Sequence, residues 1–200
     1  MASNDKASKL LGLHRSTELL TVVNVWDVIS AKVVADIPGT KALATASHSI
    51  AASRGYEDGE NIPVDEMIEE VRRIAAATDL PVTADLEGGY GNAAATVRKA
   101  IGAGVVGANI EDQMKPLGEA VAQVEAIMKA AAAEGVPDFV LNARTDVFAR
   151  AGTGRRTRCW PTRSNGATRT SKQVPRSSSS RASCPRSRSR PWSRSSGRSG

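Results

Sequence analysis

Short β-branched segments alternate with longer alanine-rich segments through the first 150 residues, and this alternation constrains the fold more than any other feature of the sequence. Apolar runs predict five strands, at residues 19–25, 42–46, 82–85, 105–110 and 139–143. Helical spacing of apolar residues between them predicts helices at residues 31–37, 63–77, 92–101 and 118–134. Strands and helices that alternate in this way form a parallel α/β sheet.

Two parallel architectures accommodate five strands, and the end of the first strand favours one of them. A doubly wound dinucleotide-binding fold has a Gly-rich phosphate loop directly after its first strand, whereas here the strand runs into Trp26-Asp27. A (β/α)8 TIM barrel needs no such loop, and the carboxyl ends of its strands converge on the face that holds the active site. We therefore expect an α/β fold of the TIM-barrel type, represented by about five βα units in residues 1–152.

The chain divides into two parts of opposite charge. Residues 1–150 hold 14 Lys and Arg against 21 Asp and Glu, whereas residues 151–200 hold 12 Arg, one Lys, 13 Ser and no acidic residue. We expect an acidic catalytic domain at residues 1–152 and a disordered Ser/Arg-rich tail at residues 153–200. The tail gives the alternative function of this sequence, non-specific nucleic-acid binding through phosphates. It carries no RNA-binding motif, so we expect no specific nucleic-acid partner.

Several classes of protein are excluded by what the sequence lacks. No apolar run approaches the ~20 residues that a membrane span needs, and the N-terminus has no apolar signal-peptide core. We therefore expect no membrane partner and a cytoplasmic location. Both cysteines, Cys159 and Cys184, lie in the tail. The acidic part consequently has no thiolate nucleophile and no cysteine-based metal site.

Acidic residues follow three consecutive predicted strands. The segments are ADLEGGYG at residues 84–91, NIEDQ at 109–113 and NARTD at 142–146. Because the carboxyl ends of parallel strands meet at one face, these segments should lie side by side.

The residue types in these segments indicate a cation and an anionic substrate. A single carboxylate at a strand end is usually a helix cap or a solvated loop residue, but Asp85, Glu87 and Glu111 together favour a shared site. Carboxylates without cysteine suit an oxygen-preferring ion such as Mg²⁺ better than zinc. Arg144 suits a substrate carboxylate or phosphonate, which a guanidinium binds through two parallel hydrogen bonds.

Six segments, in this order and spacing, resemble the isocitrate lyase/phosphoenolpyruvate mutase superfamily, especially its short phosphonomutase-like members. They are NVWD at 24–27, ATAS at 44–47, GYEDGE at 55–60, PVTADLEGGYG at 81–91, IED at 110–112 and NARTD at 142–146. The resemblance covers about residues 13–152. It implies a Mg²⁺-dependent TIM-barrel lyase or mutase that forms or breaks a C–C or P–C bond. The implied substrate is a small 2-oxo-acid-like carboxylate.

The resemblance also implies which acidic residues hold the metal. Asp85 and Glu111 would bind Mg²⁺ directly or through water. Glu87 occupies a further acidic position that is often aspartate in the family.

The implied substrate site comes from neighbouring loops. The loop Thr45-Ala46-Ser47 would offer backbone N–H groups to the substrate carboxylate, and Arg144 would clamp that carboxylate. Asp58 matches a family carboxylate near the metal, and we expect Asp58 and Arg144 to be catalytic.

One difference from the family's sequence pattern reduces the number of reactions to be expected. The C–C lyases of the family carry a Lys-(Lys/Arg)-Cys-Gly-His loop after the fourth strand, and its thiol acts as an acid. Here residues 113–118 read QMKPLG, without cysteine. Cleavage of isocitrate or methylisocitrate by that mechanism is therefore not expected, while the substrate and the bond that breaks stay open.

The tail has a second explanation, a shifted reading frame. Serine codons of the TCN type, read one base out, end in TC and encode Phe, Leu, Ile or Val, so Ser177–Ser180 would become apolar. A frame restored from Arg155 with GC-rich synonymous codons contains VVFVPG, which resembles the family at the expected place. We expect a frameshift near residues 153–155, an inactive chain without the last three strands, and loss of the final helix that family homo-oligomers exchange.

Overall fold

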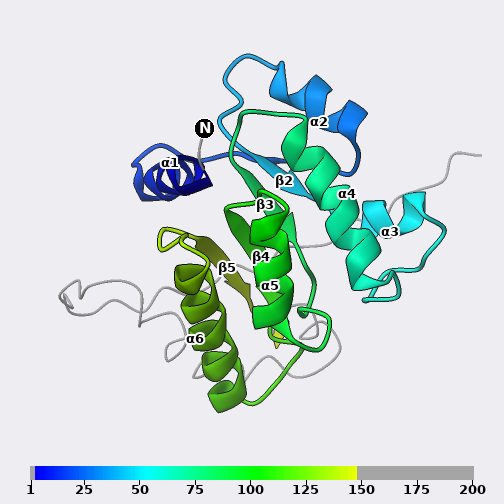
Figure 1. The fold of residues 1–200 in the computed structure, drawn as a ribbon, viewed down its shortest axis with the longest axis vertical. Coiled ribbons are helices and arrows are strands. Elements are labelled where there is room, and N and C mark those ends of the chain that lie inside the picture. The colour runs from blue at the N-terminus through cyan, green and yellow to red at the C-terminus, as the bar shows by residue number, and fades with distance from the viewer. Residues whose placement is uncertain (1–2, 148–200) are drawn as a thin grey trace, which may run out of the picture.

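A five-stranded parallel sheet flanked by helices is the centre of the structure (Figure 1), a computed structural model that describes residues 3–147. The strands are β1 (Val23–Val25), β2 (Leu43–Thr45), β3 (Val82–Asp85), β4 (Gly107–Glu111) and β5 (Val140–Arg144). The helices are α1 (Ser3–Arg15), α2 (Val28–Ala35), α3 (Ser47–Ser53), α4 (Val64–Ala76), α5 (Ala93–Gly102) and α6 (Leu117–Ala133). The strands lie in chain order and each pairs in parallel with the next, as in a β/α barrel.

Helices α4, α5 and α6 lie side by side over one face of the sheet (Figure 1). In α4 the buried residues Met67, Val71 and Ile74 recur at helical spacing, while Arg72 and Arg73 on the other side are exposed. Burial of this apolar stripe against the sheet stabilises the layer.

Helix α1 covers the amino ends of the strands. Leu10 is fully buried, and the Lys6 ammonium donates to the carbonyl of Thr78, 3.0 Å away. The Ser8 hydroxyl donates to the carboxylate of Asp138 at 2.6 Å. Thr78 and Asp138 precede β3 and β5, so α1 occupies the amino-terminal end of the sheet and leaves the carboxyl ends on the opposite side.

The packing of α1 requires a glycine at the start of β4. A Cβ at Gly107 would lie 2.9 Å from the Val140 carbonyl oxygen and 3.0 Å from both Leu10 Cδ2 and Thr83 Oγ1. We expect Gly107→Ala to lower the free energy of unfolding by about 1–3 kcal/mol, because the crowded core must shift. Urea denaturation measures this change.

The control for that substitution is Gly12→Ala in α1, where a Cβ meets nothing within 4 Å. Alanine should stabilise the helix there by about 0.5–1 kcal/mol. Equal stability of Gly107→Ala and the unaltered protein would contradict the close packing of Leu10 beneath β4.

Two differences from the predicted elements have local causes. The first strand begins at Val23 rather than at residue 19, and Leu19 is 92% exposed. Helix α2 begins earlier than predicted because Asp27 caps it. The Asp27 carboxylate accepts from the Ser30 N–H at 2.6 Å, and the Ser30 hydroxyl accepts from the Asp27 N–H at 3.1 Å.

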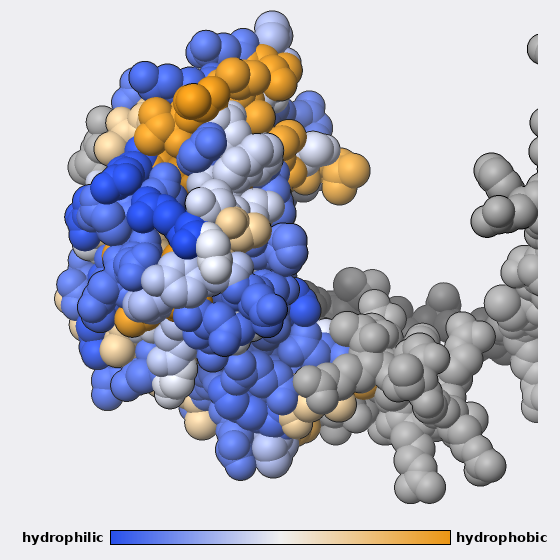
Figure 2. Space-filling view, turned by 90° about the vertical axis from the view of Figure 1, so that its right-hand side faces the viewer, coloured by the Kyte–Doolittle hydropathy of each residue, from blue (hydrophilic) through white to orange (hydrophobic). Residues whose placement is uncertain are grey.

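Helix α2 also presents an apolar outer surface. Ile29, Val33 and Ile37, four residues apart, are all more than half exposed. Figure 2 shows apolar side chains gathered at the top of the molecule, the end at which α2 lies in Figure 1. The strand beside it, β1, is one edge of the described sheet, and β5 is the other.

Within residues 3–147 no helix has the length and apolar character to cross a membrane. The predictions that concern the Ser/Arg tail lie outside the described residues. These are its disorder, the frameshift near residues 153–155 and the nucleic-acid alternative.

Candidate active site

Two rows of polar side chains cross the carboxyl ends of the central strands. Asp85 on β3 is in register with Asn109 on β4, which is in register with Asn142 on β5. Two residues further along, Glu111 on β4 is opposite Arg144 on β5. Because side chains alternate with a period of two, both rows lie on the same face of the sheet. We call the first the amide row and the second the charged row.

Neutral donors hold the Asp85 carboxylate in place. Its Oδ2 accepts from the Ser47 hydroxyl at 2.7 Å and from the Ser47 N–H at 3.3 Å. Its Oδ1 accepts from the Asn109 amide at 3.1 Å and from the Glu87 N–H at 3.5 Å. No ion pair of the described residues includes Asp85, so its carboxylate is fixed in position by neutral groups, and Arg144 acts on its charge only from a distance.

The charged row contains an ion pair. Arg144 Nη1 lies 2.5 Å from Glu111 Oε1, and Arg144 also contacts the buried Asp146, with 3.0 Å between Nη2 and Oδ1. Burial raises the pKa of Glu111 and outweighs the opposing effect of Arg144, and the charges of Asp146, Asp85 and Glu87 add to the rise. Burial disfavours the charge on Arg144, but Glu111 and Asp146 together raise its pKa.

Glu87 lies in the loop that follows β3, where its carbonyl accepts from the Glu111 N–H at 2.7 Å, and it is 5% exposed. Its carboxylate accepts from the Tyr90 hydroxyl at 3.0 Å and from the Glu60 N–H at 2.5 Å. The Glu60 carboxylate in turn accepts from the Tyr90 N–H at 2.6 Å. These reciprocal hydrogen bonds connect the loop after α3 to the loop after β3.

The loops around the rows contain strained backbone. All non-glycine residues with positive φ in residues 3–147 lie in the loops that follow α3, β3 and β4, namely Glu60, Glu87, Tyr90, Gln113 and Met114. Such conformations cost of order 1–3 kcal/mol each and cluster at functional sites. The loops also touch: a Cβ at Gly88 would lie 2.0 Å from Gln113 Nε2.

The substrate-binding residues expected from the sequence occupy the end of β2 and the start of α3. Thr45 and Ser47 are buried, and the Thr45 hydroxyl accepts from the Asp85 N–H at 3.0 Å. The Ala46 N–H donates to the Val25 carbonyl at 3.0 Å. The expected backbone donors are therefore bonded within the protein, and Ser47 brings both of its donors to Asp85.

Asp58 lies at the edge of this region. Its side chain is exposed in the loop after α3, and its charge contributes to the raised pKa of Glu87. The residues that sequence analysis did not single out are Glu60, Tyr90, Asn109, Asn142 and Asp146.

Glu87 gives the site a measurable pH dependence. Burial raises its pKa above the ordinary 4.5, against the effect of its bonds to Tyr90 and Glu60, and the charges of Asp58 and Glu60 raise it further. A carboxyl with a raised pKa stabilises the fold at low pH, and this contribution is lost as pH rises through the raised value. We therefore expect the free energy of unfolding of Glu87→Gln, relative to the unaltered protein, to increase as pH rises above about 4.5.

Urea denaturation across this pH range measures the effect. Glu119→Gln, at an exposed glutamate of α6, is the control and should show the pH dependence of the unaltered protein. If the stability of Glu87→Gln depended on pH in the same way as that of the unaltered protein and of Glu119→Gln, the raised pKa of Glu87 would be contradicted.

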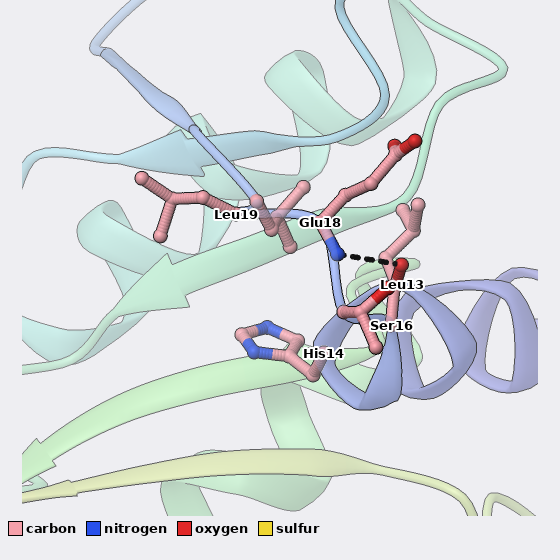
Figure 3. A pocket seen from close by; sticks show the side chains of 7 residues that line it. Leu13, His14, Ser16, Glu18 and Leu19 are labelled. Carbon is pink, nitrogen blue, oxygen red and sulfur yellow. Dashed lines mark hydrogen bonds between the residues drawn. The ribbon is translucent and has the colours of Figure 1, made fainter.

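A separate hollow lies next to the end of α1 and contains none of these acidic residues (Figure 3). It is lined by Leu13, His14, Ser16, Thr17, Glu18, Leu19 and Leu20. The Glu18 N–H donates to the Ser16 hydroxyl beside it, at 3.1 Å. Its lining comes from α1 and the segment before β1, so the hollow is not part of the rows.

Comparison with known proteins assigns the family. The family model for phosphoenolpyruvate phosphomutase matches residues 10–164, which is more than half of the chain. The chain belongs to the phosphoenolpyruvate phosphomutase family. This confirms the superfamily assignment made from the sequence motifs, and the parallel sheet in chain order is the corresponding part of its TIM barrel.

Relatives in this family include structurally characterised proteins and enzymes. A protein of Burkholderia cenocepacia J2315 described as a phosphonomutase is 41% identical, with a TM-score of 0.73 over 82% of this chain and 67% of its own. An oxaloacetate decarboxylase of Rhodopseudomonas palustris (strain BisB18) is 36% identical over 63% of this chain and 48% of its own length. A 2,3-dimethylmalate lyase, a PEP mutase/isocitrate lyase superfamily member, is 29% identical, with a TM-score of 0.65. The match covers 74% of this chain and 55% of the lyase chain.

These relatives define a superfamily of lyases and mutases that act on small oxo-acid and related carboxylate substrates. The chain spans about half the length of the curated relatives it matches.

Proposed function

We propose that this phosphoenolpyruvate phosphomutase family chain contains the metal and substrate site of a Mg²⁺-dependent lyase or mutase. The reaction forms or breaks a C–C or P–C bond in a small 2-oxo-acid-like carboxylate. The observation that carries this proposal is the meeting of Asp85 and Glu111 with Arg144 at the carboxyl ends of three adjacent strands.

The donor set fits Mg²⁺. No three His, Cys, Asp or Glu side chains of residues 3–147 are grouped as a complete metal site. Mg²⁺ does not need such a group, because it is usually bound by one or two carboxylates and keeps water or substrate oxygens. Asp85 and Glu111 would hold it, and Glu87, whose carboxylate is bonded to Tyr90 and Glu60, would add negative charge nearby. Burial is the main cause of the raised pKa of Glu111, and the charges of Asp146, Asp85 and Glu87 add to it, so a cation beside these carboxylates would offset part of that rise.

The bound metal would act as a Lewis acid toward an oxygen of the substrate. The chain's own residues would orient the substrate around it. Arg144, whose side chain is 45% exposed, can bind a carboxylate through two nitrogens. The Thr45-Ala46-Ser47 loop would contribute the Ser47 hydroxyl and N–H once the metal binds Asp85. Asp58, exposed beside Glu87, would be the catalytic carboxylate.

Arg144→Gln tests the substrate half of the proposal. We expect oxalate, a small dicarboxylate probe, to bind only with metal present and to bind Arg144→Gln at least about tenfold more weakly, which is 1.4 kcal/mol. The affinity for Mn²⁺ alone should stay equal or rise, because Glu111 loses its cationic partner. Isothermal titration with Mn²⁺, then with oxalate, measures both.

Arg98→Gln is the control, since Arg98 pairs with Glu134 on the exposed surface of the helices. It should bind Mn²⁺ and oxalate as the unaltered chain does. Unchanged oxalate affinity in Arg144→Gln, or binding of oxalate without metal, would contradict the proposed roles.

A further inference from the structure

The amide row is a continuous chain of hydrogen bonds across three strands. The Asn142 amide donates to Asn109 Oδ1 at 2.7 Å, and the Asn109 amide donates to Asp85 Oδ1 at 3.1 Å. Asn109 is half-buried between the two, whereas Asn142 is exposed at the end of the row. The direction of donation is therefore the same throughout, from β5 to β3.

This arrangement fixes which side of the Asn109 amide faces Asp85. A primary amide has an oxygen that accepts and a nitrogen that donates, and its neighbours decide which way it points. The Asp85 carboxylate can only accept, so the Asn109 nitrogen must face it, and the Asn142 amide donates to the Asn109 oxygen on the other side. Asn142 thus holds Asn109 in the orientation that donates to Asp85, although within residues 3–147 Asn142 itself forms no hydrogen bond with Asp85.

An amide is also the residue type that an acidic cluster can tolerate at this place. Asp85 and Glu111 already lie at the ends of the adjacent strands β3 and β4, and Glu87 follows β3 two residues later. Asparagine supplies a donor to Asp85 without a further charge. A lysine or arginine there would pair with the carboxylate and oppose the binding of a cation.

We propose that Asn109 is a positioning residue that orients the Asp85 carboxylate toward a divalent cation, and that Asn142 helps to hold Asn109 in place. The inference rests on the proposed metal site and extends it to two residues that do not touch the metal. Removing an outer partner of a metal ligand typically lowers metal affinity 10–100-fold, and this is the effect expected here.

Asn142→Asp separates positioning from simple electrostatics. The new carboxylate can only accept, so it would repel Asn109 Oδ1 and compete with Asp85 for the amide nitrogen of Asn109. Positioning therefore predicts weaker metal binding, by about 10-fold or more. A purely electrostatic view predicts tighter binding, because a negative charge has been added near the site. Asn142 is exposed, so the substitution should leave folding intact.

The experiment measures the Mn²⁺ dissociation constant of the full 200-residue chain by the paramagnetic resonance signal of free Mn²⁺. The variants are Asn142→Asp, Asn109→Ala and the matched control Asn24→Asp. Asn24 lies on β1 in register with Ala44 and outside the amide row, so its variant adds the same charge to the same sheet. We expect weaker binding in the first two and equal or tighter binding in the control.

Side-chain amide resonances give a second readout without metal. The Asn109 amide signal should shift in Asp85→Asn and in Asn142→Asp, but not in Asn24→Asp. Mn²⁺ affinities of Asn142→Asp and Asn109→Ala within twofold of the unaltered chain would overturn the positioning role while leaving the metal site standing. Mn²⁺ binding that is absent, or indifferent to Asp85→Asn, would instead overturn the proposed metal site and this role with it.

Discussion

Asp85→Asn should lower the affinity for divalent metal by more than about 100-fold, since even outer partners of metal ligands are worth 10–100-fold. Asparagine is almost the same size as aspartate and can keep the hydrogen bond from the Ser47 hydroxyl, so the substitution mainly removes the charge. No described residue forms a direct ion pair with that charge. Loss of this charge should therefore lower the affinity for a divalent cation more than loss of any other group in the site.

Titration of Asp85→Asn and of the unaltered chain with Mg²⁺ and Mn²⁺ measures the effect. Asp79→Asn is the matched control, because Asp79 is exposed and precedes the same strand at its amino end. It should bind metal as the unaltered chain does. Equal metal affinity in Asp85→Asn and Asp79→Asn would show that the metal binds elsewhere.

The second large effect concerns turnover. We expect the 200-residue chain to bind metal but to convert oxaloacetate, 2,3-dimethylmalate and phosphonopyruvate at least about 100-fold more slowly than a chain with all eight barrel units. The proposed ligands lie on β3 and β4, which are paired on both sides, so metal binding needs only the described sheet. Arg144 lies on β5, an edge of that sheet, and an error of about 1 Å in its position can cost about 100-fold in rate.

The comparison chain is expressed from a gene in which the insertion or deletion of one base near codons 153–155 restores the reading frame expected from the sequence. Both proteins are assayed with Mg²⁺ and the three substrates, and unfolding curves show whether each folds cooperatively. Turnover of the 200-residue chain equal to that of the longer one would contradict the proposed inactivity. The nucleotide sequence at these codons tests the frameshift itself.

Local sequence predicted the regular elements well where apolar residues mark one face. Strand β3 has the predicted bounds, and α4 ends within one residue of them, because Val71 and Ile74 define its buried side. Helices α1 and α3 were missed. In α1 only Ala7 and Leu10 are buried, and α3 is seven residues long, so neither has an apolar stripe that sequence alone can detect.

The site was predictable only in part, for a similar reason. Each expected metal residue follows an apolar strand, which is a local signal. The contacts of Asn109 and Asn142 depend on the register of separate strands, and that register is not visible in either strand alone. A partial signal existed, because Asn109 and Glu111 are polar residues two apart in an otherwise apolar strand. The bond between Glu60 and Glu87 joins loops 27 residues apart and had no such signal.

The position of α1 beneath the strands has a consequence for biosynthesis. Its Ser8 hydroxyl bonds to Asp138, 130 residues further along the chain. At synthesis rates of about 5–20 residues per second, Ser8 leaves the ribosome's active centre on the order of ten seconds before Asp138 is made. Helix α1 thus cannot complete its docking until a segment made long after it is available. Until then Leu10 must be kept from other apolar surfaces, so chaperone contacts during translation should concentrate on this helix.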